Sequence, residues 1–486
     1  KPQTNGDMTM RKFFPVMVSA LALSAAIAIT PAAAADQATL DKLTELIEKQ
    51  QAALDAQSRE LSALRAQVQS LQGQQKETAA AVVAQKKALE SAPKASGGTQ
   101  TASAAPAGDK KYVEQGDFPG AIKVPGTDVS FKVGGQIKVD AIYSNGSTGV
   151  SEDLFQTRTI TTGNTNESGR SRIHARETRL NVDVRSPTEY GDLRAFAEFD
   201  LFGQAVSKPQ SQVNGYDVRL RHAWVQVGGL MAGQNWSTFN DVAAFAETLD
   251  FAQVNGESFI RQPQIRWTNK FDDGWSLAVA AENPEGDLSD TVPAAVAQSD
   301  GIPDMIAALK WEQDWGHLQT GALYRRLAID NGAVDTATSG YGVNLSGKIK
   351  TDVFSDKDSL KFQVNYGDGI GRYINDLQVT RNESFDAVLN GNDLETLKAY
   401  SGYVSYQAVF SPKWRSNLTG GYVYVDQPDF QPGSSMESTT YIAYNIIWSP
   451  IPKLDLGLEF LYGQREDVDG DDGDATRVQA AAKYTF

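Results

Sequence analysis

A group of arginines in the first half of the C-terminal region has the chemistry to bind anions. The group consists of Arg179, Arg185, Arg194, Arg219 and Arg221. Alternate side chains of an extended chain share a face, so Arg194 lies on the same side as Glu198 and Asp200. Guanidinium groups on a low-dielectric wall attract carboxylates and phosphates and bind them through paired hydrogen bonds. The alternative is that they pair with Asp183, Glu198 and Asp200 and only line a water-filled wall.

Four further cations are candidates for the same wall. Lys132 and Lys138 lie on the polar face of the alternating segment 129–143. Arg261 and Arg266 lie in the segment 259–268, where Pro263 predicts a bulge. Because a bulge changes which side chains share a face, the sequence does not assign both arginines to the same side. We include all four in the predicted solute-binding set.

An acidic segment follows the motif GQNWSTF at 233–239. This segment, 240–257, is too long and too mixed in composition for a simple turn. Folded inward, it would face the arginines and set the narrowest cross-section of a pore, and the alternative is an ordinary external loop. Opposed acidic and basic surfaces create a transverse field that orients charged or dipolar solutes. The residues predicted to form this constriction are Trp236, Asp241, Glu247, Asp250 and Glu257.

The elements that must position these side chains are predicted to be β-strands. In the segments 129–143 and 477–486, apolar and polar side chains alternate, as in a strand with lipid on one side and water on the other. Tyr484 and Phe486 close the chain and are expected to join an aromatic girdle. Similar alternation recurs at 193–201, 341–350, 360–366, 400–410, 440–448 and 454–462, and about sixteen such segments can be placed.

Long and short connections alternate between these segments. The long polar ones are 144–171, 203–216, 283–303, 367–396 and 466–474, and the tight ones are 186–188, 228–229, 272–274, 411–412 and 449–452. Short turns at one rim and long loops at the other are typical of outer-membrane barrels, whereas a soluble sandwich does not need this alternation. The predicted fold class is therefore all-β, a sixteen-stranded antiparallel transmembrane β-barrel preceded by an N-terminal α-helical coiled coil.

The N-terminal part of the chain is predicted to contain three segments. Residues 1–35 combine two basic residues, an apolar run and an Ala-rich site, which indicates a leader with a secretory signal peptide. Residues 36–90 carry heptads that begin at Leu40 and indicate a coiled coil; a trimer fits, although heptads alone do not exclude a dimer. Residues 91–117, rich in Ala, Gly, Ser and Pro, indicate a flexible linker, and residues 118–486 form the barrel.

Composition argues against several functional classes. The 486 residues include no Cys, so thiol chemistry is excluded, and a net charge of −15 argues against nucleic-acid binding. A mean hydropathy of −0.37 does not suit a helical membrane protein. The only histidines, His174, His222 and His317, occur in no catalytic motif, so we expect neither an enzyme nor a cofactor. The acidic run 466–474 lacks a complete calcium-loop pattern, and we expect no metal site.

Several motifs together resemble the DcaP-like outer-membrane porins. They are IKVPGT at 122–127, GQNWSTF at 233–239, RQPQIRWT at 261–268, GDGIGRY at 367–373 and the terminal Phe486, in addition to the coiled coil and the linker. The resemblance covers nearly all of the chain beyond the leader. It implies a homotrimer of sixteen-stranded barrels with a periplasmic coiled coil, which takes up small anions such as dicarboxylic acids. It also makes Arg179, Arg194, Arg219 and Arg221 candidates for solute contact.

The predicted function is therefore passive diffusion of small anionic solutes, dicarboxylates in particular, through an Arg-lined constriction in the bacterial outer membrane. The predicted partners are outer-membrane lipid and lipopolysaccharide, further copies of the chain, the solutes, and peptidoglycan or a periplasmic partner that contacts the coiled coil. One alternative is a sugar or general-diffusion porin. A sugar porin would carry stacking aromatics along the lumen, and here most aromatics fall on the lipid side. Another alternative is an envelope tether that acts through the coiled coil.

Overall fold

A computed structural model describes the C-terminal region of the chain. The described residues are 114–146, 153–163, 169–203, 216–286, 288, 301–330, 334–378, 383 and 385–486. The predicted leader, the predicted coiled coil and the predicted linker up to residue 113 lie outside these residues. The last part of the predicted linker forms strand β1 (Glu114–Gln115), which pairs with β2 (Ile122–Lys123) ahead of the first long strand.

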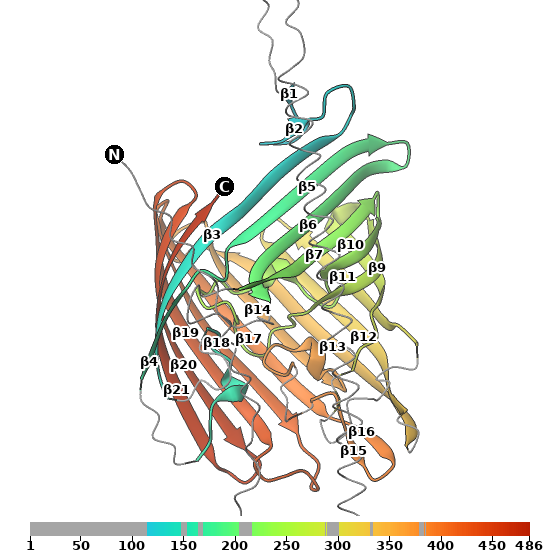
Figure 1. Ribbon diagram of the computed structural model, residues 1–486, viewed down its shortest axis with the longest axis vertical. Coiled ribbons are helices and arrows are strands. Elements are labelled where there is room, and N and C mark those ends of the chain that lie inside the picture. The colour runs from blue at the N-terminus through green and yellow to red at the C-terminus, as the bar shows by residue number, and fades with distance from the viewer. Residues whose placement is uncertain are drawn as a thin grey trace, which may run out of the picture. The chain divides into compact units, whose positions relative to one another are not determined.

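The region is a closed antiparallel barrel of sixteen strands, as predicted from the sequence. The first is β3 (Ser130–Asn145), and the last is β21 (Asp472–Thr485). These two pair with each other, with Val478 opposite Tyr143, and this pairing closes the barrel (Figure 1). The second strand is interrupted: β4 (Arg170–His174) and β5 (Arg179–Thr188) both pair with β3.

The other barrel strands follow one another around the wall, each paired with its neighbours in the sequence. They are β6 (Gly191–Gly203), β7 (Asp217–Val227), β8 (Leu230–Trp236), β9 (Arg261–Lys270), β10 (Trp275–Glu282), β11 (Asp304–Gln313), β12 (Gly316–Asp330), β13 (Asp335–Thr351), β14 (Asp358–Asp368), β17 (Lys398–Ser411), β18 (Trp414–Asp426), β19 (Met436–Ile451) and β20 (Leu454–Asp467). Most extend a few residues beyond the alternating segments found in the sequence, because backbone pairing continues where side-chain alternation fades.

Apolar side chains on these strands point outward. On β13, Tyr341, Val343 and Leu345 are exposed, whereas Asn344 and Ser346 between them are buried on the inner side. Aromatic pairs mark two levels of the outer surface. Trp414 stacks on Trp448 close to one rim, and other pairs, such as Tyr366 with Tyr400, lie towards the opposite rim. An apolar band between aromatic girdles is the surface expected for a barrel in a lipid bilayer.

The short turns, the start of β3 and the C-terminus of the chain lie at one rim of the barrel. The long loops lie at the other rim. The β15 (Ala387–Asn390) and β16 (Asp393–Thr396) hairpin lies at the long-loop rim, opposite the C-terminus (Figure 1). One predicted turn is displaced. Pro187, expected within the turn, continues β5 and pairs with Asp192, so the turn falls at residues 189–190. Proline is tolerated there because it occupies the end of a strand.

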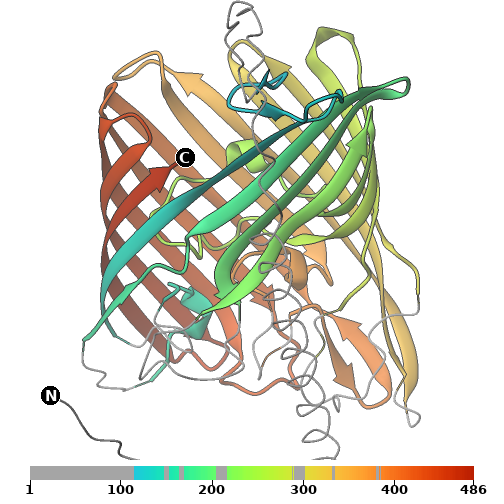
Figure 2. The ribbon, with the colours of Figure 1, turned by 45° about the horizontal axis from the view of Figure 1, so that its top comes forward.

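Two long connections fold into the barrel. Loop L3 (residues 237–260, between β8 and β9) and residues 369–378, the first part of loop L6 (residues 369–397, between β14 and β17), lie inside the wall (Figure 2). From L6, Tyr373, Ile374 and Phe385 are fully buried in one apolar cluster with Phe239 of L3 and Val423 of β18. This cluster fills the part of the lumen next to β18, so an open path must lie towards the opposite wall.

Helical structure in the described residues is limited to single turns. They are η1 (Thr157–Thr159), η2 (Val242–Ala244), η3 (Asp272–Gly274) and η4 (Gly371–Tyr373). None of the helices formed by the described residues is long and apolar enough to cross a membrane.

Because the outward face of the strands is apolar, we expect a charge placed there at mid-strand to lower the stability of the barrel in lipid. Val343 is at the centre of β13 and its side chain is 51% exposed. V343R should destabilise the barrel in lipid by about 2–4 kcal/mol, because an arginine at the bilayer midplane loses its hydration. The measurement is urea unfolding in vesicles, with V343L as the matched control. Equal midpoints for V343R and V343L would contradict the assignment of this face to lipid.

Candidate functional site

Loop L3 is held against the inner wall by a buried ion pair. Asp250 of L3 pairs with Arg477 of β21 at 3.0 Å, and both side chains are fully buried. On the neighbouring strand β20, the carboxylate of Glu459 accepts hydrogen bonds from the backbone N–H groups of Leu249 (2.9 Å) and Asp250 (2.8 Å). Lys138 of β3 donates to the carbonyl of Leu249 at 2.6 Å. Loop L3 is therefore fixed to the strands that close the barrel.

Two other acidic residues of L3, Glu247 and Asp241, also attach the loop to the wall. Glu247 binds Arg415 of β18, with the closest N–O distance at 2.7 Å. Asp241 binds the His317 ring at 2.7 Å, and both side chains are buried. Glu257 is fully buried, and neither of its carboxylate oxygens has a hydrogen-bond partner among the described residues. Glu247 and Asp250 line the main cavity of the lumen, whereas Asp241 and Glu257 lie outside its lining.

The environment of these carboxyl groups changes their affinity for protons. Burial raises the pKa of Glu257 well above its ordinary value, and the positive charge of Lys361 opposes this only in part. For Glu247, burial also acts to raise the pKa, but the hydrogen bonds and charge of Arg415 lower it more, so the pKa lies below its ordinary value. The attachment of L3 through Glu247 therefore depends on the negative charge of this carboxylate at neutral pH.

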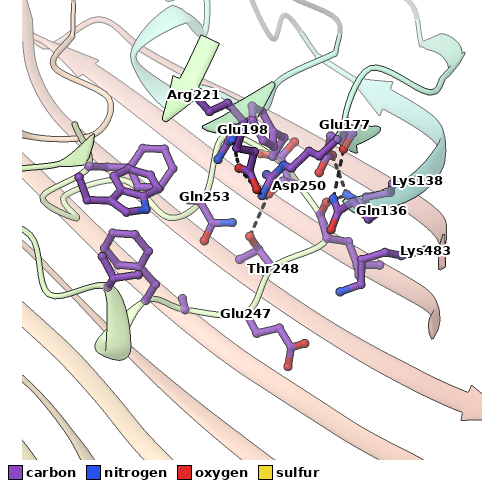
Figure 3. A pocket seen from close by; sticks show the side chains of 18 of the residues that line it. Gln136, Lys138, Glu177, Glu198, Arg221, Glu247, Thr248, Asp250, Gln253 and Lys483 are labelled. Atoms are coloured by element: carbon purple, nitrogen blue, oxygen red, sulfur yellow. Dashed lines mark hydrogen bonds and ion pairs between the residues drawn. The ribbon is translucent and has the colours of Figure 1, made fainter. Parts of the chain in front are cut away.

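A cavity of about 730 Å³ separates L3 from the arginine-bearing strands. One side is formed by β5, β6 and β7, including Arg179, Arg194 and Arg221. The other side is formed by L3 and by the wall behind it. Arg221 and Glu198 lie on the opposite side of the cavity from Glu247 (Figure 3). The cavity thus lies between L3 and the wall that bears the arginines.

The five arginines share three carboxylates. Arg185 and Arg194 both bind Asp183 at 2.8 Å, and Arg219 and Arg221 both bind Asp200, at 2.7 and 2.8 Å. Glu198 binds Arg221 at 2.7 Å and lies 4.0 Å from Arg179. Pairing with these acids, the alternative left open by the sequence, thus does take place. Within this ion-paired group, five guanidiniums face three carboxylates, so the group has a surplus of positive charge.

Arg179 has the weakest carboxylate contact of the five. Its Nε is buried and has no hydrogen-bond partner among the described residues. Together with Gln136 and Glu198, it lines both the main cavity and a smaller one of about 270 Å³, which extends to Lys132 and Phe486 near the short-turn rim. Arg179 thus lies where the two cavities meet, in position to contact a solute passing from one to the other.

The remaining predicted cations fall into different surroundings. Arg261 lies over the Trp236 ring at 4.4 Å, and its Nη1 is buried without a hydrogen-bond partner among the described residues. Arg266 is on the same side of β9 as the buried Gln264. Lys138 lines the main cavity but binds Glu177 at 2.6 Å. Four arginines of the predicted set, Arg185, Arg219, Arg261 and Arg266, lie outside the lining of the main cavity.

Of the aromatic side chains that line the cavity, the sequence predicted Trp236 and missed the others. The lining includes Phe196, Trp224, Trp236, Phe245, Phe251 and Phe259. Phe196 shares the strand face of Arg194, which could have revealed it. Trp224 could not be found in this way, because a bulge at Arg221 places Arg221 and His222 both inside and reverses the alternation after it. The three aromatics of L3 lie in irregular chain, where no periodicity applies.

A closed barrel narrowed by an inward-folded loop is the architecture of an outer-membrane channel. Residues 119–485 match the family described as the porin subfamily, and the chain therefore belongs to this family of bacterial outer-membrane porins. No curated protein matches the sequence.

Among solved structures, the outer membrane channel DcaP of Acinetobacter baumannii is similar at 24% identity and a TM-score of 0.65. The similarity covers 75% of this chain and 99% of that chain. It shows a shared fold and confirms the resemblance to DcaP-like porins. The outer membrane protein OmpT of Vibrio cholerae is more distant, with 10% identity, coverage of 75% of this chain and 99% of that chain, and a TM-score of 0.47.

Because Glu247 binds Arg415 as a carboxylate, we expect the attachment of L3 to the wall to depend on pH. Because the pKa of folded Glu247 lies below its ordinary value of 4.5, this contact contributes stability above that value and loses it as pH falls. Single-channel recordings from neutral pH down to about pH 3 should therefore show increasing current fluctuation as L3 loosens. E247Q should fluctuate already at neutral pH and change less on acidification. A variant E247Q that follows the wild type at every pH would contradict this role.

Proposed function

We propose that this porin provides a passive path for small anions, dicarboxylates in particular, along the wall formed by β5, β6 and β7. The observation that supports this most is the sharing of three carboxylates by five arginines on one side of the cavity. A surplus of fixed positive charge at a narrow, low-dielectric site raises the local concentration of anions. The acids of L3 offset it little, because wall cations bind Glu247 and Asp250.

A solute carboxylate can contact the arginines without breaking the ion pairs of the wall. The Arg194 side chain is 40% exposed, so its guanidinium is accessible while it binds Asp183. Arg179, at the junction of the two cavities, offers a guanidinium whose ion pair with Glu198 is long, at 4.0 Å. Two cationic positions along one path suit a solute with a carboxylate at each end. Contacts of this kind are weak enough to allow release, so diffusion down a gradient needs no energy source.

The aromatic side chains of the cavity favour a second candidate, a sugar porin. Trp236 packs edge-on against Phe245, with ring centroids 5.2 Å apart, and lies 4.8 Å from Phe259. Apolar ring faces of this kind can stack against sugars. Current block separates the two candidates: succinate should reduce the chloride current and maltose should not. Block by maltose at lower concentrations than by succinate would favour the sugar porin.

Substitutions at two positions of β5 test the anion path. R179Q should lower the ratio of chloride to potassium permeability by about twofold or more, because it removes the cation with the weakest carboxylate contact from the junction of the cavities. The measurement is the reversal potential in a planar bilayer under a potassium chloride gradient. R185Q is the matched control, because Arg185 lies outside the main cavity and Asp183 keeps Arg194 as a partner.

Three outcomes are informative. Wild-type anion selectivity that falls in R179Q and persists in R185Q supports the proposal. Cation selectivity of the wild type, with no block by succinate, would contradict the anion path while leaving the channel itself intact. Equal effects of the two substitutions would show that the field of the whole wall, and not the Arg179 position, decides selectivity.

We also propose that the chain assembles as a trimer, with lipopolysaccharide around it and with the predicted coiled coil in the periplasm. The heptads of residues 36–90 support this assembly. Deletion of residues 36–111 tests it. If the coiled coil contributes to assembly, light scattering of the detergent-solubilised variant should show monomers. Stable trimers with unchanged solute flux would show that the segment is an accessory, available for contact with peptidoglycan or another periplasmic partner.

A further inference from the structure

Loop L6 is bound to the part of L3 that lines the cavity. The contact joins residues 373–378 of L6 to residues 252–259 of L3. At its centre, Ser258 and Ile374 form an antiparallel β-bridge. The backbone N–H of Phe259 donates to the Tyr373 carbonyl at 3.0 Å, and the N–H of Asn375 donates to the Glu257 carbonyl at 2.7 Å. Two loops separated by more than a hundred residues thus behave as one hydrogen-bonded unit.

Asn375 makes most of this contact. Besides the bond from its own N–H, its side-chain amide donates to the carbonyls of Ala252 (2.7 Å) and Val254 (2.8 Å). Its carbonyl accepts the N–H of Gly256 at 3.1 Å. The side chain is buried, so water does not substitute for these donors. One asparagine therefore satisfies four backbone groups of L3.

The L3 segment held by Asn375 has an unusual backbone. Gln253, between the two carbonyls bound by the Asn375 amide, has φ of 67°. Gly256 has φ of 73°, and a Cβ there would lie 2.7 Å from the Tyr422 carbonyl of the wall. A non-glycine residue in the left-handed region needs support from its surroundings. Asn375 provides that support on one side, and the barrel wall encloses the segment on the other.

The same segment sets the position of two cavity-lining side chains. Gln253 and Phe251 both line the main cavity. The Phe251 ring lies 5.4 to 5.5 Å from the guanidinium carbons of Arg179, Arg219 and Arg221. Phe251 thus limits the space directly in front of the arginine wall. A shift of residues 252–254 would move this ring and change both the width of the path and the access to the guanidiniums.

We propose that Asn375 is a positioning residue that sets the width of the pore. It acts from L6, behind L3, by holding residues 252–256 so that Phe251 and Gln253 stay in the cavity. The L6 loop is thereby a second determinant of the constriction, although Asn375 itself is not among the cavity-lining residues. The inference rests on the proposed path through this cavity, but it does not depend on anion preference, because pore width affects all small ions.

The test is single-channel conductance in potassium chloride for N375A. The substitution removes both side-chain donors, so L3 should fluctuate, with increased open-channel noise and a mean conductance changed by about 1.5-fold or more. N390A is the matched control in the same loop, because Asn390 lies in the exposed β15–β16 hairpin and binds Glu395. Thermal unfolding of both variants is recorded in parallel. An N390A channel should match the wild type.

A reversible crosslink shows whether the effect comes from the L3–L6 contact. Ser258 and Ile374 form a non-hydrogen-bonded antiparallel pair, because the residues on either side of them make the backbone hydrogen bonds. Side chains approach most closely in such a pair, which suits a disulfide. The chain has no Cys, so S258C/I374C introduces a single possible disulfide. In the N375A background, oxidation should reduce the noise to the wild-type level, and reduction should restore it. General destabilisation of the barrel would not respond to this local crosslink in that way.

Two results would overturn the inference. The first is wild-type conductance and noise in folded N375A, and the second is excess noise that persists after the crosslink has formed. If N375A does not fold, Q378A applies the same test, because the Gln378 side chain donates to the Phe259 carbonyl at 2.6 Å and thus joins L6 to L3. Quiet Q378A channels would then contradict the role of L6. Failure of the anion proposal would instead appear as cation selectivity with these noise effects unchanged.

Discussion

The buried ion pair between Asp250 and Arg477 is the constraint on which the rest of the site depends. Both side chains are fully buried, so losing one partner would leave a charge without compensation, at a cost of about 3–5 kcal/mol. The pair fixes the middle of L3 to the last strand, and Glu459 binds the adjacent backbone. It therefore keeps the loop inside the barrel, where it narrows the lumen in front of the arginines.

This arrangement divides the charges of the lumen unequally. Asp241, Glu247 and Asp250 of L3 bind residues of the wall and Glu257 is buried, whereas the arginine group on β5, β6 and β7 has five guanidiniums for three carboxylates. The protein thus uses its carboxylates for structure and leaves part of its cationic groups accessible. A chain with a net charge of −15 can in this way present a locally positive path, because the field at a narrow site is set by the nearest groups.

The sequence predicted the barrel well because alternation and loop lengths are local properties of each strand. It identified the arginine wall and the segment around Asp250 for the same reason. The pairing partners were not predictable: Arg477 and Asp250 are 227 residues apart, and no periodicity relates them. The bulge at Arg221 reversed the expected side for Trp224, and the contacts of Asn375 depend on the packing of two irregular loops. These features depend on packing between residues that are far apart in the sequence, which side-chain alternation does not predict.

Anomalous diffraction from crystals soaked in bromide, with a parallel rubidium soak, tests most directly whether the open path is cationic. The account predicts bromide in the main cavity next to Arg179, at its junction with the smaller cavity, and no rubidium there. Rubidium bound beside Glu247, or beside Asp455 of β20, which also binds Arg415 at 3.0 Å and lines the cavity, with no bromide near the arginines, would contradict it. That result would mean that the ion pairs of the wall leave no accessible positive charge and that L3 faces a path for cations.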